Sequence, residues 1–191
     1  AGLLMPSDAG KLIKTLKKTV KVPVQLHSHC TSGVAPMTYL KAVEAGCDGI
    51  DTALSPLAMG TSQPATEVMY KTLQAAGVKV KLNEDSMAVA TEYFRDYRRR
   101  VEKNGMLDIK MMDVDTDTLR YQVPGGMLSN LYSQMKEQHM EDRFEDVLKE
   151  VPRVREDLGE PPLVTPSSQI VGTQAVFNVM SGKRYKIASV Q

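Results

Sequence analysis

Residues 22–29 read Val-Pro-Val-Gln-Leu-His-Ser-His, and this stretch decides how the rest of the chain is interpreted. The apolar run 22–26 predicts a buried strand. Two of the three histidines of the chain, His27 and His29, follow at the end of that strand. Because residues i and i+2 of a strand point to the same face, the two imidazoles can meet at one metal ion. The next residues, 30–33, predict a turn that leads the chain away.

Helices and strands alternate along residues 1–103. The apolar periodicity predicts helices over 8–20, 35–45, 64–76 and 84–103, and strands over 22–26, 48–53 and 78–82. Repeated strand–helix units imply an α/β fold with a parallel sheet and a site at the carboxyl ends of its strands. Three strands are too few for a closed (β/α)8 barrel. Residues 1–103 are therefore either a small sheet or the latter part of a TIM-type barrel.

Residues 104–191 follow a different pattern. The segment 106–123 is mixed, and Pro-Gly-Gly at 124–126 predicts a turn. Helices are expected over 127–138, 141–150 and 168–181, with Pro152 interrupting one of them. We therefore predict a second, mostly helical C-terminal domain over 104–191.

Composition narrows the class of protein. The 24 basic and 23 acidic residues nearly cancel, which argues against a broad surface for nucleic acid. No apolar run approaches the length of a membrane span, and no signal peptide opens the chain. The two cysteines do not form a disulfide framework. These features lead us to expect a reduced, cytoplasmic protein.

Each candidate residue also has a purely structural interpretation. A His-x-His pair on a strand is often a core pair or an exposed pair, but the place of His27 and His29 at a carboxyl strand end favours a metal site. Thr61, taken alone, is an ordinary loop or cap residue. Cys30 is expected to point to the opposite face as a packed thiol, and Asp51 to support the end of the second strand.

Five stretches in order carry a family resemblance. They are Ala-Gly-Leu-Leu at 1–4, Leu-His-Ser-His-Cys-Thr-Ser-Gly at 26–33, Asp-Thr-Ala at 51–53 with Gly-Thr-Ser-Gln-Pro at 60–64, Val-Pro-Gly-Gly-Met at 123–127 with Ser-Asn-Leu at 129–131, and Val-Thr-Pro-Ser-Ser at 164–168 with Val-Gly at 171–172. Together they span nearly the whole chain. The chain resembles the carboxyltransferase part of biotin-dependent enzymes, such as the oxaloacetate decarboxylase alpha subunit, pyruvate carboxylase (especially where this part is a separate subunit) and the transcarboxylase 5S subunit.

The resemblance implies a metal-dependent carboxyltransferase that moves CO2 between oxaloacetate or pyruvate and biotin, with the biotin carried on a separate domain. In that family a His-x-His pair supplies two ligands to zinc, cobalt or manganese, which matches His27 and His29. The threonine of a Thr-Ser-Gln-Pro motif passes a proton between biotin and the pyruvate enol, which matches Thr61. The resemblance also assigns 1–103 to the latter part of the barrel and 104–191 to the conserved carboxylase domain.

Some family features fall outside these residues. An aspartate ligand, a carbamylated lysine and the substrate-binding residues are expected upstream of Ala1, and the Met-Lys-Met motif of a biotinyl domain is not found. We therefore expect the chain alone to be inactive and to need a preceding barrel half. The resemblance further implies a homodimer and, for a sodium-pumping decarboxylase, membrane-bound partner subunits.

Two other classes of function stay open. One is a metal-dependent lyase or aldolase-like barrel enzyme that works without biotin. The other is an inactive fragment whose helical part serves assembly. Decarboxylation, carboxylation and transcarboxylation share one pocket, so the sequence does not separate them, and two histidines do not identify the metal.

Overall fold

The computed structural model describes residues 2–107 and 112–188. The chain forms two compact units, Ala1–Thr116 and Asp117–Gln191, called here the N-terminal unit and the C-terminal unit. Each has a hydrophobic core of its own. The division at residue 103 into two domains stays a prediction.

The N-terminal unit alternates helices and short strands, as its periodicity predicts. In chain order its elements are α1 (Pro6–Thr19), β1 (Gln25–Leu26), α2 (Ala35–Glu44), β2 (Gly49–Ile50), the 3-10 turn η1 (Ser55–Leu57), α3 (Thr66–Ala75) and α4 (Glu84–Lys103). Proline opens α1, where its fixed φ suits the first helical turn, and two lysines lie in the last turn near the negative end of the helix dipole.

The sheet of this unit is small and parallel. β1 pairs with β2 in the register Gln25 to Gly49 and Leu26 to Ile50. The last hydrogen bond between the two strands runs from the Asp51 N–H to the Leu26 carbonyl oxygen at 3.1 Å. The two strands separate after these residues. A parallel register places the carboxyl ends of both strands at the same edge. The segments that begin at residues 27 and 51 therefore start side by side.

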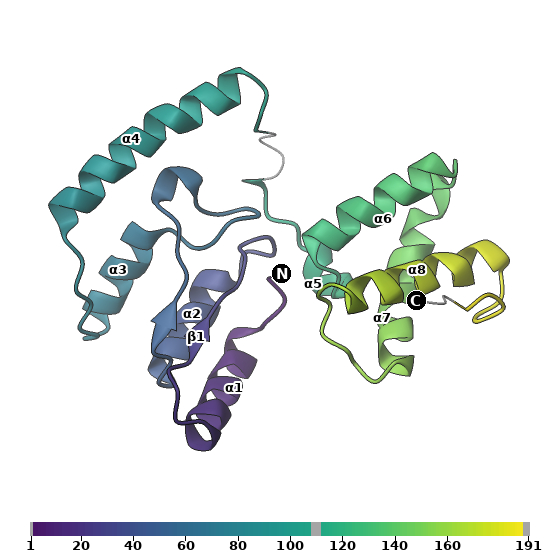
Figure 1. The fold of residues 1–191 in the computed structure, drawn as a ribbon, viewed down its shortest axis with the longest axis horizontal. Coiled ribbons are helices and arrows are strands. Elements are labelled where there is room, and N and C mark those ends of the chain that lie inside the picture. The colour runs from purple at the N-terminus through teal and green to yellow at the C-terminus, as the bar shows by residue number, and fades with distance from the viewer. Residues whose placement is uncertain (1, 108–111, 189–191) are drawn as a thin grey trace. The chain divides into compact units, whose positions relative to one another are not determined.

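The helices cover this sheet and enclose a core. α1 lies along α2, and both flank β1 (Figure 1). The buried members of the core come from α1, β1, α2 and α3: Ala9, Ile13, Leu26, Tyr39, Ala42, Met69 and Leu73. Burial of such apolar side chains is the main favourable term in folding. This shared core holds α2 against β1.

The predicted strand over 78–82 is wrong. Residues 78–82, all of which the structure describes, form no strand. Val78 and Val80 nevertheless pack against the core, as the alternation predicts. A strand needs a neighbouring backbone for its hydrogen bonds, and alternation of apolar residues does not supply one. The predicted strand over 22–26 shortens to two residues for the same reason. The assignment of this unit to the latter part of a (β/α)8 barrel stays a prediction.

The C-terminal unit is helical in its described residues, which agrees with the predicted helical character of this region. Its elements are α5 (Asp117–Tyr121), α6 (Gly125–Glu137), the 3-10 turn η3 (Glu141–Arg143), α7 (Phe144–Asp157) and α8 (Ser167–Ser181). The expected turn at 124–126 is wrong, because α6 begins at Gly125. Pro152 lies inside α7 and does not end it. Val147, Val151 and Val154 are fully buried along this helix, and their packing outweighs the lost backbone hydrogen bond.

Across the part of the chain that the structure describes, no helix is long and apolar enough to cross a bilayer.

Candidate metal centre and the pocket of the C-terminal unit

The candidate metal centre begins where β1 ends. The backbone leaves the sheet after Leu26, and the next three residues carry the two histidines. The rings of His27 and His29 meet edge to face, with their centroids 5.0 Å apart and their planes at 80°. Their Nε2 atoms lie 3.1 Å from each other. The structure therefore brings the predicted pair together at one point.

The other nitrogen of each ring is held by an acceptor. Nδ1 of His27 lies 2.8 Å from the Asp51 carboxylate, and Nδ1 of His29 lies 2.6 Å from the backbone carbonyl oxygen of Thr61. Carboxylate and carbonyl oxygens accept hydrogen bonds, so each Nδ1 carries the proton in the neutral ring. This tautomer leaves a lone pair on each Nε2. Two lone pairs that face each other cannot share a hydrogen bond.

This arrangement fits a divalent cation. Metal-binding histidines almost always donate their second ring N–H to a carboxylate or a backbone carbonyl, as both do here. At a zinc–nitrogen distance of about 2.0–2.1 Å, nitrogens 3.1 Å apart subtend an angle of about 100°, near the tetrahedral value. Among the described residues, no group of three or more His, Cys, Asp or Glu side chains could hold a metal. Within the described part of the chain, the pair would thus supply two ligands to such an ion.

Asp51 has a more specific place than sequence reasoning gave it. It accepts from His27 and also from the side-chain amide of Gln25. The hydrogen bond from His27 first, and then that from Gln25, hold the pKa of the Asp51 carboxyl below its usual range. An ionised carboxylate fixes the tautomer of the His27 ring. The parallel register, which sets residues 27 and 51 side by side, brings about this contact.

Thr61 reaches the centre through its backbone. It lies in the loop 59–63, where Met59 and Gly60 both have positive φ values, 70° and 54°. The Cys30 N–H donates to the Ser62 carbonyl at 2.8 Å and ties this loop to the histidine segment. The prediction that the two loops come together is thus confirmed, although the atom that contacts His29 is the Thr61 carbonyl oxygen. The Thr61 side chain is exposed, and its role in proton transfer stays a prediction.

Cys30 lies where the sequence predicts. Cys30 is 1% exposed, and burial raises the pKa of its thiol to about 11. It is therefore a packed thiol and not a third ligand at the histidine pair. His139, the third histidine, is exposed in the C-terminal unit.

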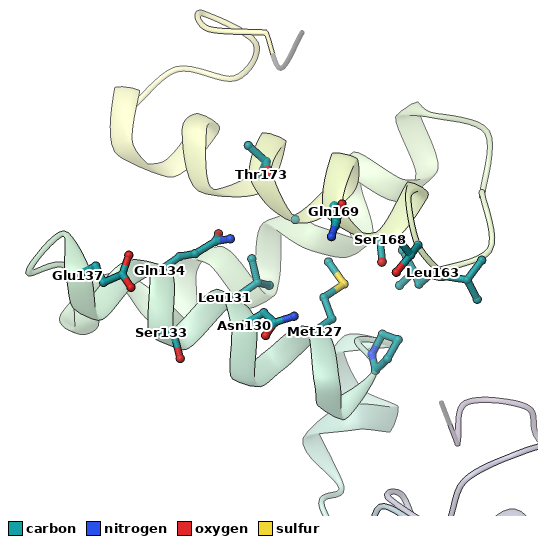
Figure 2. A pocket seen from close by; sticks show the side chains of 14 residues that line it. Met127, Asn130, Leu131, Ser133, Gln134, Glu137, Leu163, Ser168, Gln169 and Thr173 are labelled. Carbon is teal, nitrogen blue, oxygen red and sulfur yellow. The ribbon is translucent and has the colours of Figure 1, made fainter. Parts of the chain in front are cut away.

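The C-terminal unit holds a pocket of about 710 Å³ between α6 and the start of α8. Figure 2 shows Met127 and Leu131 of α6 directed toward α8. Polar side chains form much of its lining: Asn130, Ser133, Gln134, Glu137, Thr165, Ser168, Gln169 and Thr173. Two of the five stretches that carry the family resemblance, 123–131 and 164–172, therefore contribute to opposite sides of this pocket. Sequence reasoning assigned these residues no role.

Comparison with known proteins agrees with this division. Residues 1–93 match the HMGL-like family model, and residues 118–189 match the model of the conserved carboxylase domain. A pyruvate carboxylase subunit of Methanocaldococcus jannaschii is 55% identical over 98% of the chain, and the methylmalonyl-CoA carboxyltransferase 5S subunit of Propionibacterium freudenreichii is 44% identical over 96%. The chain spans about a third of the length of these relatives, 33% and 36%.

A solved structure agrees with the sequence matches. The carboxyl transferase domain of Rhizobium etli pyruvate carboxylase, solved with pyruvate and biocytin, aligns with 96% of the chain at a TM-score of 0.77 and 28% identity. The chain covers 30% of that structure. The two family models, the relatives and this structural match agree, and the chain belongs to the family of carboxyltransferase domains of biotin-dependent enzymes.

Proposed function

We propose that the chain is the part of a biotin-dependent carboxyltransferase that provides two metal ligands and the conserved carboxylase domain. The whole protein would move CO2 between a 2-oxo acid, pyruvate or oxaloacetate, and biotin carried on a separate domain. The relatives named as a pyruvate carboxylase subunit and as a carboxyltransferase 5S subunit support this reaction class. In this proposal residues 1–103 form the latter part of the barrel.

One observation carries the proposal: two histidine Nε2 atoms converge while both Nδ1 atoms are held by acceptors. A divalent cation at His27 and His29, whether zinc, cobalt or manganese, would polarise the carbonyl oxygen of the 2-oxo acid as a Lewis acid. Asp51 and the Thr61 carbonyl oxygen would orient the two rings toward the ion. The remaining coordination positions would be filled by groups elsewhere in the whole protein, by water or by substrate.

We assign the Thr61 hydroxyl to proton transfer between biotin and the enol of pyruvate. Its support is position, because the loop that carries it contacts His29 directly. The test is turnover of Thr61→Val and Thr61→Ser in the assembled enzyme, with Thr165→Val in the C-terminal pocket as the comparison. Loss in Thr61→Val with recovery in Thr61→Ser is expected. Loss of turnover only in Thr165→Val would assign the proton transfer to the pocket of the C-terminal unit instead.

Metal content of the purified chain tests the ligand pair. We expect zinc, cobalt or manganese to bind the wild-type chain and to be lost from His27→Ala and His29→Ala. His139→Ala is the matched control, because it removes an exposed histidine that lies outside the pair. Equal metal content in all four proteins would overturn the proposed site.

The match of residues 118–189 to the conserved carboxylase domain favours the biotin-dependent branch over the lyase-like alternative. For the whole protein we further propose a homodimer, a biotinyl carrier domain as partner and a cytoplasmic location. Membrane-bound partner subunits belong to the decarboxylase form of the proposal. Because the chain spans only about a third of the length of these relatives, we expect it to be inactive alone and to gain activity when the rest of the barrel is supplied. Turnover by the purified chain would refute that expectation.

A further inference from the structure

Tyr39 holds the peptide that links the two histidines. It lies on α2, is fully buried, and belongs to the core of the N-terminal unit. Its hydroxyl accepts a hydrogen bond from the Ser28 backbone N–H at 2.8 Å and donates one to the Ser28 carbonyl oxygen at 3.1 Å. Ser28 stands between His27 and His29 in the chain. The Tyr39 side chain thus contacts both backbone polar groups of Ser28.

The strand ladder does not reach this residue. Its last hydrogen bond runs from the Asp51 N–H to the Leu26 carbonyl, and Ser28 lies two residues further on. Ser28 is only 5% exposed, so water does not readily take the place of strand partners for its backbone N–H and carbonyl groups. A buried peptide group must find a partner within the protein. Tyr39 supplies both, because a hydroxyl can donate and accept at once, which no phenylalanine ring can do.

The two hydrogen bonds from Tyr39 to the Ser28 backbone affect how the two imidazole rings are oriented. The Nε2 atoms of His27 and His29 lie 3.1 Å apart, and this separation depends on the course of the backbone between the two residues. Rotation of either Ser28 peptide group would turn one imidazole away from the other. We propose that Tyr39 is a positioning residue for the metal-binding histidine pair, an inference that rests on the proposed function of that pair.

The hydroxyl is suited to this task at all physiological pH values. Burial is the main cause that raises the pKa of Tyr39 to about 12. The proton that it donates to the Ser28 carbonyl is therefore retained.

The test compares Tyr39→Phe with Tyr70→Phe in the 191-residue chain. Tyr70 is also a buried tyrosine of the same unit, and its hydroxyl accepts from the Gln74 side chain at 2.8 Å, away from the histidines. The probes are Zn2+ for affinity and Co2+ for its visible absorption spectrum. We expect Tyr39→Phe to weaken Zn2+ binding about tenfold or more and to change the Co2+ spectrum, as for other groups that orient metal ligands. Tyr70→Phe should leave both unchanged.

The outcomes separate this inference from the function on which it rests. If the wild-type chain binds Zn2+ no better than His27→Ala, the metal site itself is wrong. If the wild-type chain binds and Tyr39→Phe matches Tyr70→Phe in affinity and spectrum, the positioning role is wrong.

Hydrogen exchange in the wild-type chain gives a measurement that does not depend on how the variant folds. The Ser28 amide should exchange slowly, as a buried hydrogen-bonded amide does. Exchange as fast as that of an exposed loop amide would show that the hydroxyl does not hold this peptide, and would overturn the inference.

Discussion

The buried carboxylate of Glu150 is the point in the C-terminal unit where one substitution should cost most. Its side chain is 7% exposed and accepts from Arg184 Nε at 2.6 Å, Asn178 Nδ2 at 2.8 Å and Arg153 Nη1 at 2.9 Å. Asn178 in turn accepts the Tyr185 N–H at 2.7 Å. The network therefore joins α7, α8 and the segment that follows α8.

Replacement of Glu150 by alanine should cost about 3 kcal/mol of unfolding free energy. The variant leaves the amide of Asn178, a residue only 4% exposed, without one of its partners, at about 1–3 kcal/mol. The charge-assisted bonds to Arg184 and Arg153 are lost as well. Their cost is reduced because the Arg153 side chain is 61% exposed and that of Arg184 is 35% exposed, so both regain water. These bonds therefore add about 1 kcal/mol or more.

Glu145→Ala is the matched control on the same helix. Glu145 pairs with Lys149 at 3.0 Å, but both side chains are more than half exposed. An exposed pair of this kind contributes about 0.3–0.5 kcal/mol. The intrinsic helix propensity of alanine enters both variants, but Glu145 lies in the first turn of α7 and also interacts with the positive end of the helix dipole. The difference between the variants is therefore a lower bound for the contribution of the buried network.

Hydrogen exchange of the α7 and α8 amides in urea is the appropriate assay, since a chain of two units need not unfold in one step. Glu150→Ala should lower the protection of both helices, and Glu145→Ala should leave it nearly unchanged. A difference of less than about 0.5 kcal/mol between the variants would refute the reasoning, because it would mean that water satisfies the network as well as the carboxylate does.

Three further predictions concern packing, acid stability and thiol reactivity. Gly172→Ala should destabilise the chain by about 1 kcal/mol, because its added Cβ would lie 3.0 Å from two α6 side chains, whereas Gly10→Ala, with 4.0 Å of room, should stabilise it by up to about 1 kcal/mol; urea unfolding of both variants checks this. The hydrogen bond from Lys17 holds the pKa of Asp48 below its usual range. Since the folded pKa lies below the unfolded one, this contribution is present at neutral pH and is lost as the pH falls through the folded value, so Lys17→Met should show a smaller loss of stability on acidification. Burial raises the pKa of Cys30 to about 11, so its alkylation at about pH 8 should be slow in the folded chain and fast in urea, as mass spectrometry would show.

The helices of the N-terminal unit follow from local pattern. Apolar residues at helical spacing predict 8–20, 35–45, 64–76 and 84–103, and the structure places α1, α2, α3 and α4 within a few residues of these bounds. Strands do not follow so directly. Val78 and Val80 alternate with lysines, yet a strand also requires a paired backbone, which local alternation does not encode.

Helix ends in the C-terminal unit depend on packing that a local rule cannot weigh. Proline and glycine at 124–126 and at 152 predict a turn and an interruption, yet α6 starts at Gly125 and α7 continues through Pro152. In α7 the buried valines face the core on both sides of the proline, and their burial exceeds the cost of one missing hydrogen bond. The sequence shows each local penalty but not the compensating contact.

The histidine pair could be found from spacing, but the contacts that orient it could not. Asp51 is 24 residues from His27, and Tyr39 reaches Ser28 from a helix that follows the pair. Two of the orienting groups, the Thr61 carbonyl oxygen and the Ser28 peptide, are backbone atoms that any residue would supply. No residue-type motif can reveal such groups. They become predictable only when the parallel register and the packing of α2 against β1 are known, because these two features place the acceptors and the tyrosine hydroxyl where the strand ladder ends.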